Sequence, residues 1–178
     1  MGLDTVEFLL AVEDAFGISI PNSEAEQLTT PRVLAEYIEH RLPAGSSTAC
    51  HTQRAFYKLR TGIVQAHRIP RGSIRRETSW RDILPGRSFG NAWRHMQKVA
   101  GSGDWPRASF LGFRNPAART VGDTATYLAT RAPAGLKYSG EGWTRAEIDQ
   151  VITRLIADEL GITTFSRDDR FVEELRLD

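Results

Sequence analysis

The stretch Gly2-Leu3-Asp4-Thr5-Val6-Glu7-Phe8 opens the chain and governs how the remainder is interpreted. Asp4 suits the N-cap of a helix, and Glu7, three residues later, suits the other half of a capping box. The predicted apolar stripe consists of Val6, Leu9, Leu10, Ala11 and Phe16, which recur at helical spacing, while the acidic residues Glu7, Glu13 and Asp14 occupy the other face. Gly17 suits a left-handed helix end. We therefore predict an amphipathic helix from Asp4 to Phe16 whose outer face is acidic.

The residues that follow predict a loop and a second helix. Ile18-Ser19-Ile20-Pro21 alternates like an extended segment whose two isoleucines pack on a core. Thr30-Pro31 starts the second helix, because proline suits the first helical position. The apolar stripe of this helix consists of Val33, Leu34, Tyr37, Ile38 and Leu42.

This succession of features resembles the centre of an acyl carrier protein. Helix II of that family begins with Gly-Leu-Asp-Ser-Leu, and the runs Phe16–Pro21 and Glu24–Pro31 are similar to the segment that leads to the family's last helix. The resemblance covers residues 2–42. It implies a 4'-phosphopantetheine arm, which a phosphopantetheinyl transferase moves from coenzyme A to the serine and whose thiol carries acyl or peptidyl groups. Thr5 stands at the position of that serine.

The last part of the chain resembles helix I of the family, which precedes helix II in a carrier protein and has no counterpart before residue 2 here. Thr144 and Glu147 form a capping box for a predicted helix that ends at Leu160, before Gly161. Residues 143–178 resemble helix I and loop I of a carrier protein and stop one residue before the attachment serine. The first four and the last four residues of the chain match the same four positions of the family.

The middle of the chain, residues 53–131, resembles a degenerate carrier domain between linkers at 43–52 and 132–142. A predicted helix over residues 54–67 leads to Trp80, which takes the place of the loop I anchor. Thr120-Val121-Gly122-Asp123 predicts the start of another helix, with Thr120 as its cap and Asp123 at the third position, and is similar to the start of the family's last helix. Helix I and loop I therefore occur twice, which is an internal repeat.

The expected fold is all-α, with two acyl-carrier-like small helical bundles, the outer one assembled from both chain termini. About 40 residues at either end cannot bury enough apolar surface alone. Together the ends supply three amphipathic helices, enough for a small bundle. We predict a circularly permuted carrier bundle, residues 1–42 with 143–178, into which the middle domain is inserted. Two alternatives stay open, a domain-swapped assembly and a truncated tandem array of carriers.

Charge is divided between these regions. Residues 1–42 hold eight acidic and two basic side chains, for a net charge of −6. Residues 141–178 hold ten acidic and five basic side chains, for a net charge of −5. Residues 43–140 hold four acidic and sixteen basic side chains, for a net charge of +12. The acidic ends suit docking on a basic partner or on the chain's own middle. The arginines beside Trp80, Trp93 and Trp105 also suit nucleic acid. No helix-turn-helix, zinc or RNA-binding signature supports that last class.

Two residues are candidates for the attachment of the arm. The hydroxyl of Thr5 is chemically competent, but its extra methyl group restricts χ1 and crowds the oxygen. Thr5 is therefore either a modified residue or an unmodified first-turn residue. Ser88 lies eight residues after Trp80, which is the family's spacing, but Arg87 and Phe89 flank it where the family has Asp and Leu. These neighbours favour a helix N-cap at Ser88.

The candidate partner-docking residues lie on the first predicted helix. The resemblance implies that this face meets phosphopantetheinyl transferase and acyl- or peptidyl-handling enzymes of fatty acid or polyketide biosynthesis. From charge alone, the same face is equally typical of a solvated helix surface. These residues are Asp4, Val6, Glu7, Glu13 and Asp14.

The sequence favours neither an enzyme nor a membrane protein. Its four histidines lack metal-ligand spacing, and it has no Gly-rich phosphate loop or nucleophile elbow. The single cysteine, Cys50, is incompatible with a disulfide framework. No apolar run approaches the ~20 residues of a membrane span, and no leader precedes the first helix. We predict a cytoplasmic, non-catalytic carrier protein without a metal, or an interaction module derived from one.

Overall fold

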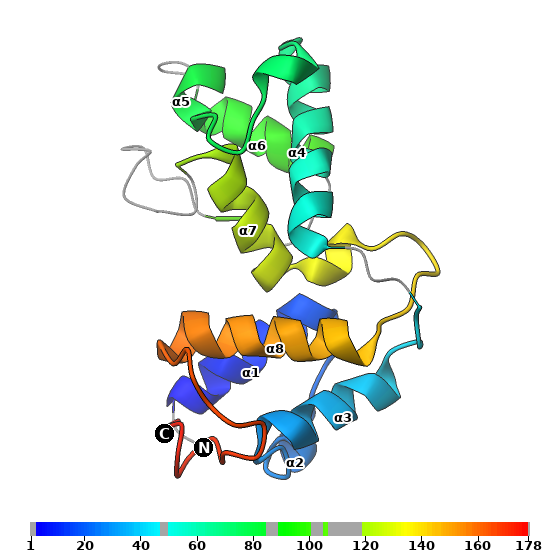
Figure 1. Ribbon diagram of the computed structural model, residues 1–178, viewed down its shortest axis with the longest axis vertical. Helices are drawn as coiled ribbons and strands as arrows, with labels where there is room; N and C mark the ends of the chain where they lie inside the picture. The colour runs from blue at the N-terminus through cyan, green and yellow to red at the C-terminus, as the bar shows by residue number, and fades with distance from the viewer. Residues whose placement is uncertain (1–2, 47–49, 85–88, 101–104, 107–118, 178) are drawn as a thin grey trace. The chain divides into compact units, whose positions relative to one another are not determined.

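The computed structural model describes residues 3–46, 50–84, 89–100, 105–106 and 119–177, and helices account for most of this part of the chain (Figure 1). In the same residues, two isolated β-bridges join Ala44 to Trp143 and Ser79 to Thr120. The predicted all-α fold class is confirmed. The helices are α1 (Leu3–Phe16), α2 (Asn22–Ala25), α3 (Pro31–Arg41), α4 (His51–His67), η1 (Arg71–Ser73), α5 (Trp80–Ile83), α6 (Phe89–Ala100), α7 (Val121–Arg131), η4 (Pro133–Leu136) and α8 (Arg145–Leu160).

The chain divides into two compact units. Met1–Thr48 and Lys137–Asp178 form one of them, here called the end unit, and Ala49–Leu136 forms the other, the middle unit. The end unit holds eighteen acidic and eight basic side chains, for a net charge of −10. The middle unit holds four acidic and fifteen basic side chains, for a net charge of +11. Almost the whole acidic charge of the protein therefore belongs to a single unit.

The end unit is a bundle in which α8, from the second half of the chain, packs against both α1 and α3. Each helix contributes its apolar stripe to one shared core. The three longer helices, α1, α3 and α8, need all of this burial, because a small domain buries a limited fraction of its surface. The core residues include Val12, Ala15, Leu34, Ile38, Val151, Ile152 and Leu155, all 2% exposed or less.

Side-chain caps mark the starts of α3, α5, α7 and α8. Thr144 Oγ1 accepts a hydrogen bond from the Glu147 backbone N–H at 3.2 Å, and Glu147 Oε2 accepts one from the Thr144 N–H at 2.9 Å. This capping box and the left-handed Gly161 (φ 70°) are confirmed. The predicted N-cap at Asp4 is wrong, because α1 begins at Leu3. Asp4 lies in the first turn instead, where its charge favours the positive end of the helix dipole.

The buried face of α1 also differs from the predicted stripe. Phe8 and Val12 point into the core (1% and 0% exposed), whereas Val6 and Leu10 are 40% and 53% exposed. Apolar residues occur all round this helix, so its own periodicity does not select one face. Contacts with α8 and with the C-terminal segment select it, and both come from the far end of the sequence.

A backbone clamp joins the two stretches of chain that lead out of the end unit. The Trp143 N–H donates to Pro43 O at 2.8 Å, and the Gly45 N–H donates to Trp143 O at 2.9 Å. The two segments approach so closely that a Cβ atom on Gly45 would lie 2.3 Å from the carbonyl carbon of Gly142. Glycine is therefore required at this crossing.

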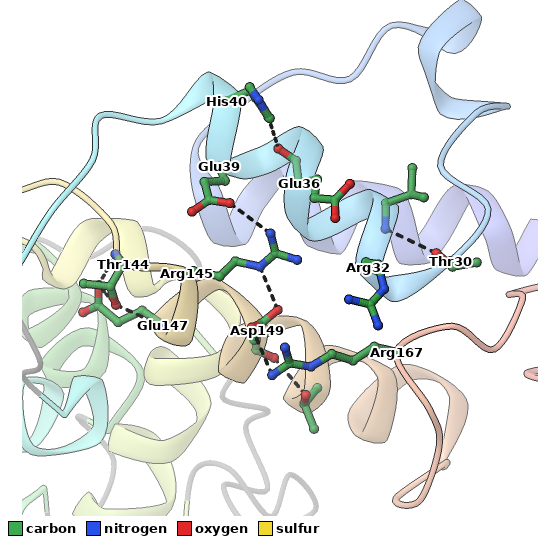
Figure 2. A network of polar contacts seen from close by, with 12 residues as sticks. Thr30, Arg32, Glu36, Glu39, His40, Thr144, Arg145, Glu147, Asp149 and Arg167 are labelled. Atoms are coloured by element: carbon green, nitrogen blue, oxygen red, sulfur yellow. Dashed lines mark hydrogen bonds and ion pairs between the residues drawn. The ribbon is translucent and has the colours of Figure 1, made fainter.

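Ion pairs tie α3 to α8 and to the segment after it (Figure 2). Arg145 donates to Glu39 Oε2 at 2.9 Å and to Asp149 Oδ1 at 3.2 Å. The guanidinium of Arg167 lies 3.1 Å from Asp149 Oδ2. Because these groups come from both ends of the chain, the network contributes to the register between α3 and α8. Each exposed pair adds at most about 1 kcal/mol.

The ion pair between Arg32 and Asp168 holds the C-terminal segment to α3. Arg32 Nη2 donates to Asp168 Oδ2 at 2.8 Å, and the Arg32 backbone N–H donates to Arg167 O at 2.9 Å. The hydrogen bond from Arg32 lowers the pKa of Asp168 below its usual range. Both side chains are exposed, so the pair fixes position more than it stabilises.

Tyr37 in α3 has a raised pKa, which gives a direct test of the packing of this helix. Burial, followed by the hydrogen bond that its hydroxyl donates to Glu24, raises the pKa of Tyr37 to about 12. A raised pKa means that the folded state favours the neutral phenol. The stabilisation from this group is therefore complete below the ordinary pKa of 10 and is lost as the pH rises through about 12.

We expect the difference in tyrosinate absorbance between the native protein and Tyr37→Phe to titrate near pH 12. In Glu24→Gln the midpoint should be lower, because the acceptor carboxylate is gone. A midpoint near pH 10 in the native protein would contradict this placement of Tyr37.

The middle unit is built round α4, which packs against α6 and α7. Trp80, Trp93 and Trp105 form a chain of edge-to-face contacts in its core, with ring centroids 4.9 Å and 5.2 Å apart. They are 0%, 2% and 5% exposed. The suggestion that these tryptophans stack on nucleic-acid bases is therefore wrong, because the core of the unit occupies their faces. At the start of α7 the predicted cap at Thr120 is confirmed, together with Asp123.

Candidate functional site

The end unit contains a cavity of about 360 Å³ that is walled by residues from both ends of the chain. One wall comes from α1, a second from α2 and the turn after it, and a third from the C-terminal segment. Most of the lining is apolar. The lining residues are Thr5, Phe8, Leu9, Ala25, Glu26, Leu28, Thr29, Arg170, Phe171, Val172, Glu173 and Leu177.

The α1 wall follows from helical spacing. Thr5, Phe8 and Leu9 are three and four residues apart, so they share one face of the helix. Phe8 is buried at the base of this face, whereas Thr5 is half-buried in the first turn. The residue that the resemblance places at the attachment position therefore borders an apolar hollow.

Phe171 holds the C-terminal wall in place. Its ring centroid lies 5.2 Å from that of Phe8, and its backbone N–H donates to Thr29 O at 3.0 Å. The chain then turns back, and the Leu177 N–H donates to Phe171 O at 2.8 Å. The cavity consequently exists only when residues near 8, 29 and 171 are assembled.

Charged groups lie at the edge of the apolar lining. Arg170 Nη2 is 3.2 Å from Glu173 Oε1, and the Arg170 backbone N–H donates to Glu174 Oε2 at 2.6 Å. These contacts order the turn that carries Val172, which is 61% exposed. An apolar interior with a charged edge suits an apolar ligand that has one polar end.

The structure places the predicted docking residues on two sides of α1. Asp4, Val6, Glu7 and Asp14 are exposed. Glu13 is half-buried, and its Oε1 accepts a hydrogen bond from the Ile20 N–H at 2.6 Å. Glu13 thus anchors the loop after α1, while the others remain available on the surface.

Ser88 lies outside the described residues. Among the residues that the structure describes, no three His, Cys, Asp or Glu side chains come together as metal ligands. None of the helices there is long and apolar enough to cross a membrane.

Apart from Thr5, the residues that form the cavity were not predicted from the sequence. Phe8, Val12 and Ala15 follow i, i+4, i+7 spacing, so a count that gave Phe8 more weight than Leu10 would have found the inner face. No local pattern indicates Phe171 or Leu28 as cavity residues, because the wall arises from packing between distant segments. No model of a known protein family and no solved structure matches this chain.

Proposed function

We propose that this protein is a carrier-type module that holds a small apolar group covalently linked through Thr5. The observation that carries the proposal is that Thr5 borders the apolar cavity of about 360 Å³. The resemblance to acyl carrier proteins at residues 2–42 selects this threonine by its position, independently of the cavity. The residue that the resemblance selects is therefore also one of those that line the cavity.

The residues present fit a phosphopantetheine arm. Attachment would join the phosphate to Thr5 Oγ1 and release adenosine 3',5'-bisphosphate from coenzyme A. The arm, when bound, supplies a thiol that holds an acyl group as a thioester. The chain's own part is to shield the apolar end of the cargo with Phe8, Leu28 and Phe171. Burial of each methylene contributes about 0.8 kcal/mol.

The second candidate is a carrier-derived interaction module without an arm. The exposure of Val6 and Leu10 beside Asp4, Glu7 and Asp14 favours it, because this face combines apolar contact area with acidic charge. Such a face suits a basic partner surface with apolar pockets.

Intact mass distinguishes the two candidates. The native protein, Thr5→Ser and Thr5→Ala would each be incubated with coenzyme A and a broad-specificity phosphopantetheinyl transferase. We expect the native protein to gain one arm and Thr5→Ala to gain none. Thr5→Ser should react faster, because its primary hydroxyl is less crowded.

The remaining outcomes decide against the carrier proposal. A gain in Thr5→Ser alone would show an intact docking face with a silent site, and would favour the interaction module. No gain in either protein would overturn the carrier function. A gain in Thr5→Ala would place the modification at another residue.

A further inference from the structure

Three planar side chains of α4 form a cluster on the surface of the middle unit. Arg60 lies one helical turn after Phe56 and Tyr57, and its Cζ is 5.2 Å from the Phe56 ring centroid and 4.9 Å from that of Tyr57. Gln53 Nε2 donates to the Tyr57 hydroxyl at 3.3 Å. Stacking on two rings restricts the orientation of the guanidinium. The Tyr57 ring keeps 44% of its surface exposed.

A cavity of about 320 Å³ adjoins this cluster, and Cys50, Thr52 and Arg76 complete its lining. The backbone of Arg76 is held against α7, because its carbonyl accepts a hydrogen bond from the Gly122 N–H at 2.8 Å. A Cβ atom on residue 122 would lie 2.8 Å from the Arg76 carbonyl oxygen, so glycine permits this close contact. Arg76 therefore borders the cavity from a fixed backbone position.

Among the described residues, the lining contains two arginines and no Asp or Glu. Arg60 Nε is buried and has no hydrogen-bond acceptor within the described part of the chain. Arg76 also borders a neighbouring hollow that contains Glu77 and Asp123, but no ion pair joins it to either one among the described residues. Arginines that line a cavity without carboxylate partners suit a bound oxyanion, because charge-assisted N–H donors bind phosphate oxygens strongly.

The size and shape of the site restrict its ligand. A volume of about 320 Å³ is at the low end for small-molecule sites, which span about 300–1,000 Å³. Guanidinium groups bind phosphate through paired N–H donors. Aromatic and arginine side chains stack on the flat rings of bases. The net charge of +11 on the middle unit raises the local concentration of anions.

We propose that this cavity binds a ligand of the mononucleotide class, with its phosphate on Arg60 and Arg76 and its ring on the exposed part of Tyr57. The site belongs to the middle unit alone. It is independent of the cavity beside Thr5 and of any modification there.

The chain's single cysteine gives a local readout of binding, because Cys50 is exposed and lines the cavity. The alkylation of Cys50 by N-ethylmaleimide, a neutral reagent, would be followed by intact mass in the full-length protein. With adenosine 5'-monophosphate at ten times its apparent Kd, we expect the rate to fall about tenfold, since about a tenth of the sites remain open. Adenosine and inorganic phosphate, tested separately at the same concentration, should change the rate less than about twofold.

Neighbouring arginines provide a matched pair of variants. Arg76→Gln should raise the nucleotide concentration needed for protection at least about tenfold, because it removes a charge-assisted contact. Arg75→Gln removes the same charge one residue away, at an exposed side chain outside the lining, and should change that concentration less than about twofold. Arg60→Lys keeps the charge but loses the planar fork, so it should also weaken protection. An unchanged alkylation rate without nucleotide would show that each variant keeps the local structure.

Three results would overturn the proposal. The first is no protection of the native protein by the nucleotide. The second is equal protection by inorganic phosphate, which would mean that the ring adds nothing. The third is an equal loss of protection in Arg75→Gln and Arg76→Gln. That result would mean that the nucleotide is attracted by the net positive charge of the middle unit and not by Arg76 in particular.

Discussion

Leu155→Asp is expected to unfold the end unit while the middle unit stays folded. Leu155 is fully buried in α8, the helix that packs against both α1 and α3. An unpaired carboxylate at this position costs several kcal/mol. A small domain has about 5–15 kcal/mol of stability in total. The loss should therefore reach helices that lie more than a hundred residues away in the sequence.

Hydrogen exchange followed by mass spectrometry would measure this effect. Protection should disappear from α1, α3 and α8 and remain in α4 and α7. Gln150→Asp adds the same charge at an exposed position of the same helix and should leave all five helices protected. If α1 and α3 stayed protected in Leu155→Asp, the two ends of the chain would not depend on each other for folding.

Trp80→Ala is expected to lower the free energy of unfolding of the middle unit by about 3–5 kcal/mol. Trp80 is completely buried, its Nε1–H donates to Thr124 Oγ1 at 2.8 Å, and its ring meets that of Trp93 edge to face. Alanine would leave a cavity at the centre of the core and would remove the donor to Thr124.

Protection of the α4 and α7 amides in increasing urea would report this loss. Trp80→Phe keeps an aromatic ring and should cost less, since the Thr124 hydroxyl retains its bond to Thr120 O at 3.2 Å. Asp82→Ala, at an exposed position of the same short helix, should change the free energy by less than about 0.5 kcal/mol. Equal effects of Trp80→Ala and Asp82→Ala would show that Trp80 does not support the core.

The sequence predicts local features of this protein well and the outcome of distant packing poorly. The capping boxes at Thr144 and Thr120 depend on residues three apart, so they are visible in the sequence. Helices whose apolar stripes lack a partner nearby indicate that the two ends need each other. By contrast, the inner face of α1 was mispredicted, because Val6, Leu10 and Phe8 are all apolar and only packing against α8 and Phe171 distinguishes them.

In the candidate sites, too, local features could be predicted from the sequence, whereas contacts between distant segments could not. Thr5 was predicted from its sequence context, but the cavity beside it could not be, since Phe8, Leu28 and Phe171 meet only in three dimensions. In the middle unit, the excess of arginine pointed to anions, whereas the choice of aromatic partners was wrong. The tryptophans are buried, and the exposed ring is Tyr57, which lies beside Arg60 on α4. Burial, which a residue's type does not reveal, separates the two groups.

The bundle of α1, α3 and α8 also has a consequence for the time course of synthesis on the ribosome. The first two helices leave the exit tunnel long before their partner has been made, because roughly 120 residues separate the end of α3 from the end of α8. At about 5–20 residues per second, the interval is roughly 6–24 s. The middle unit is synthesised completely before α8 is. During the interval, the apolar stripes of α1 and α3 cannot pack against α8 and stay exposed. A nascent chain arrested when α7 but not α8 has left the tunnel should therefore contain a folded middle unit, while α1 and α3 stay unprotected and open to chaperones.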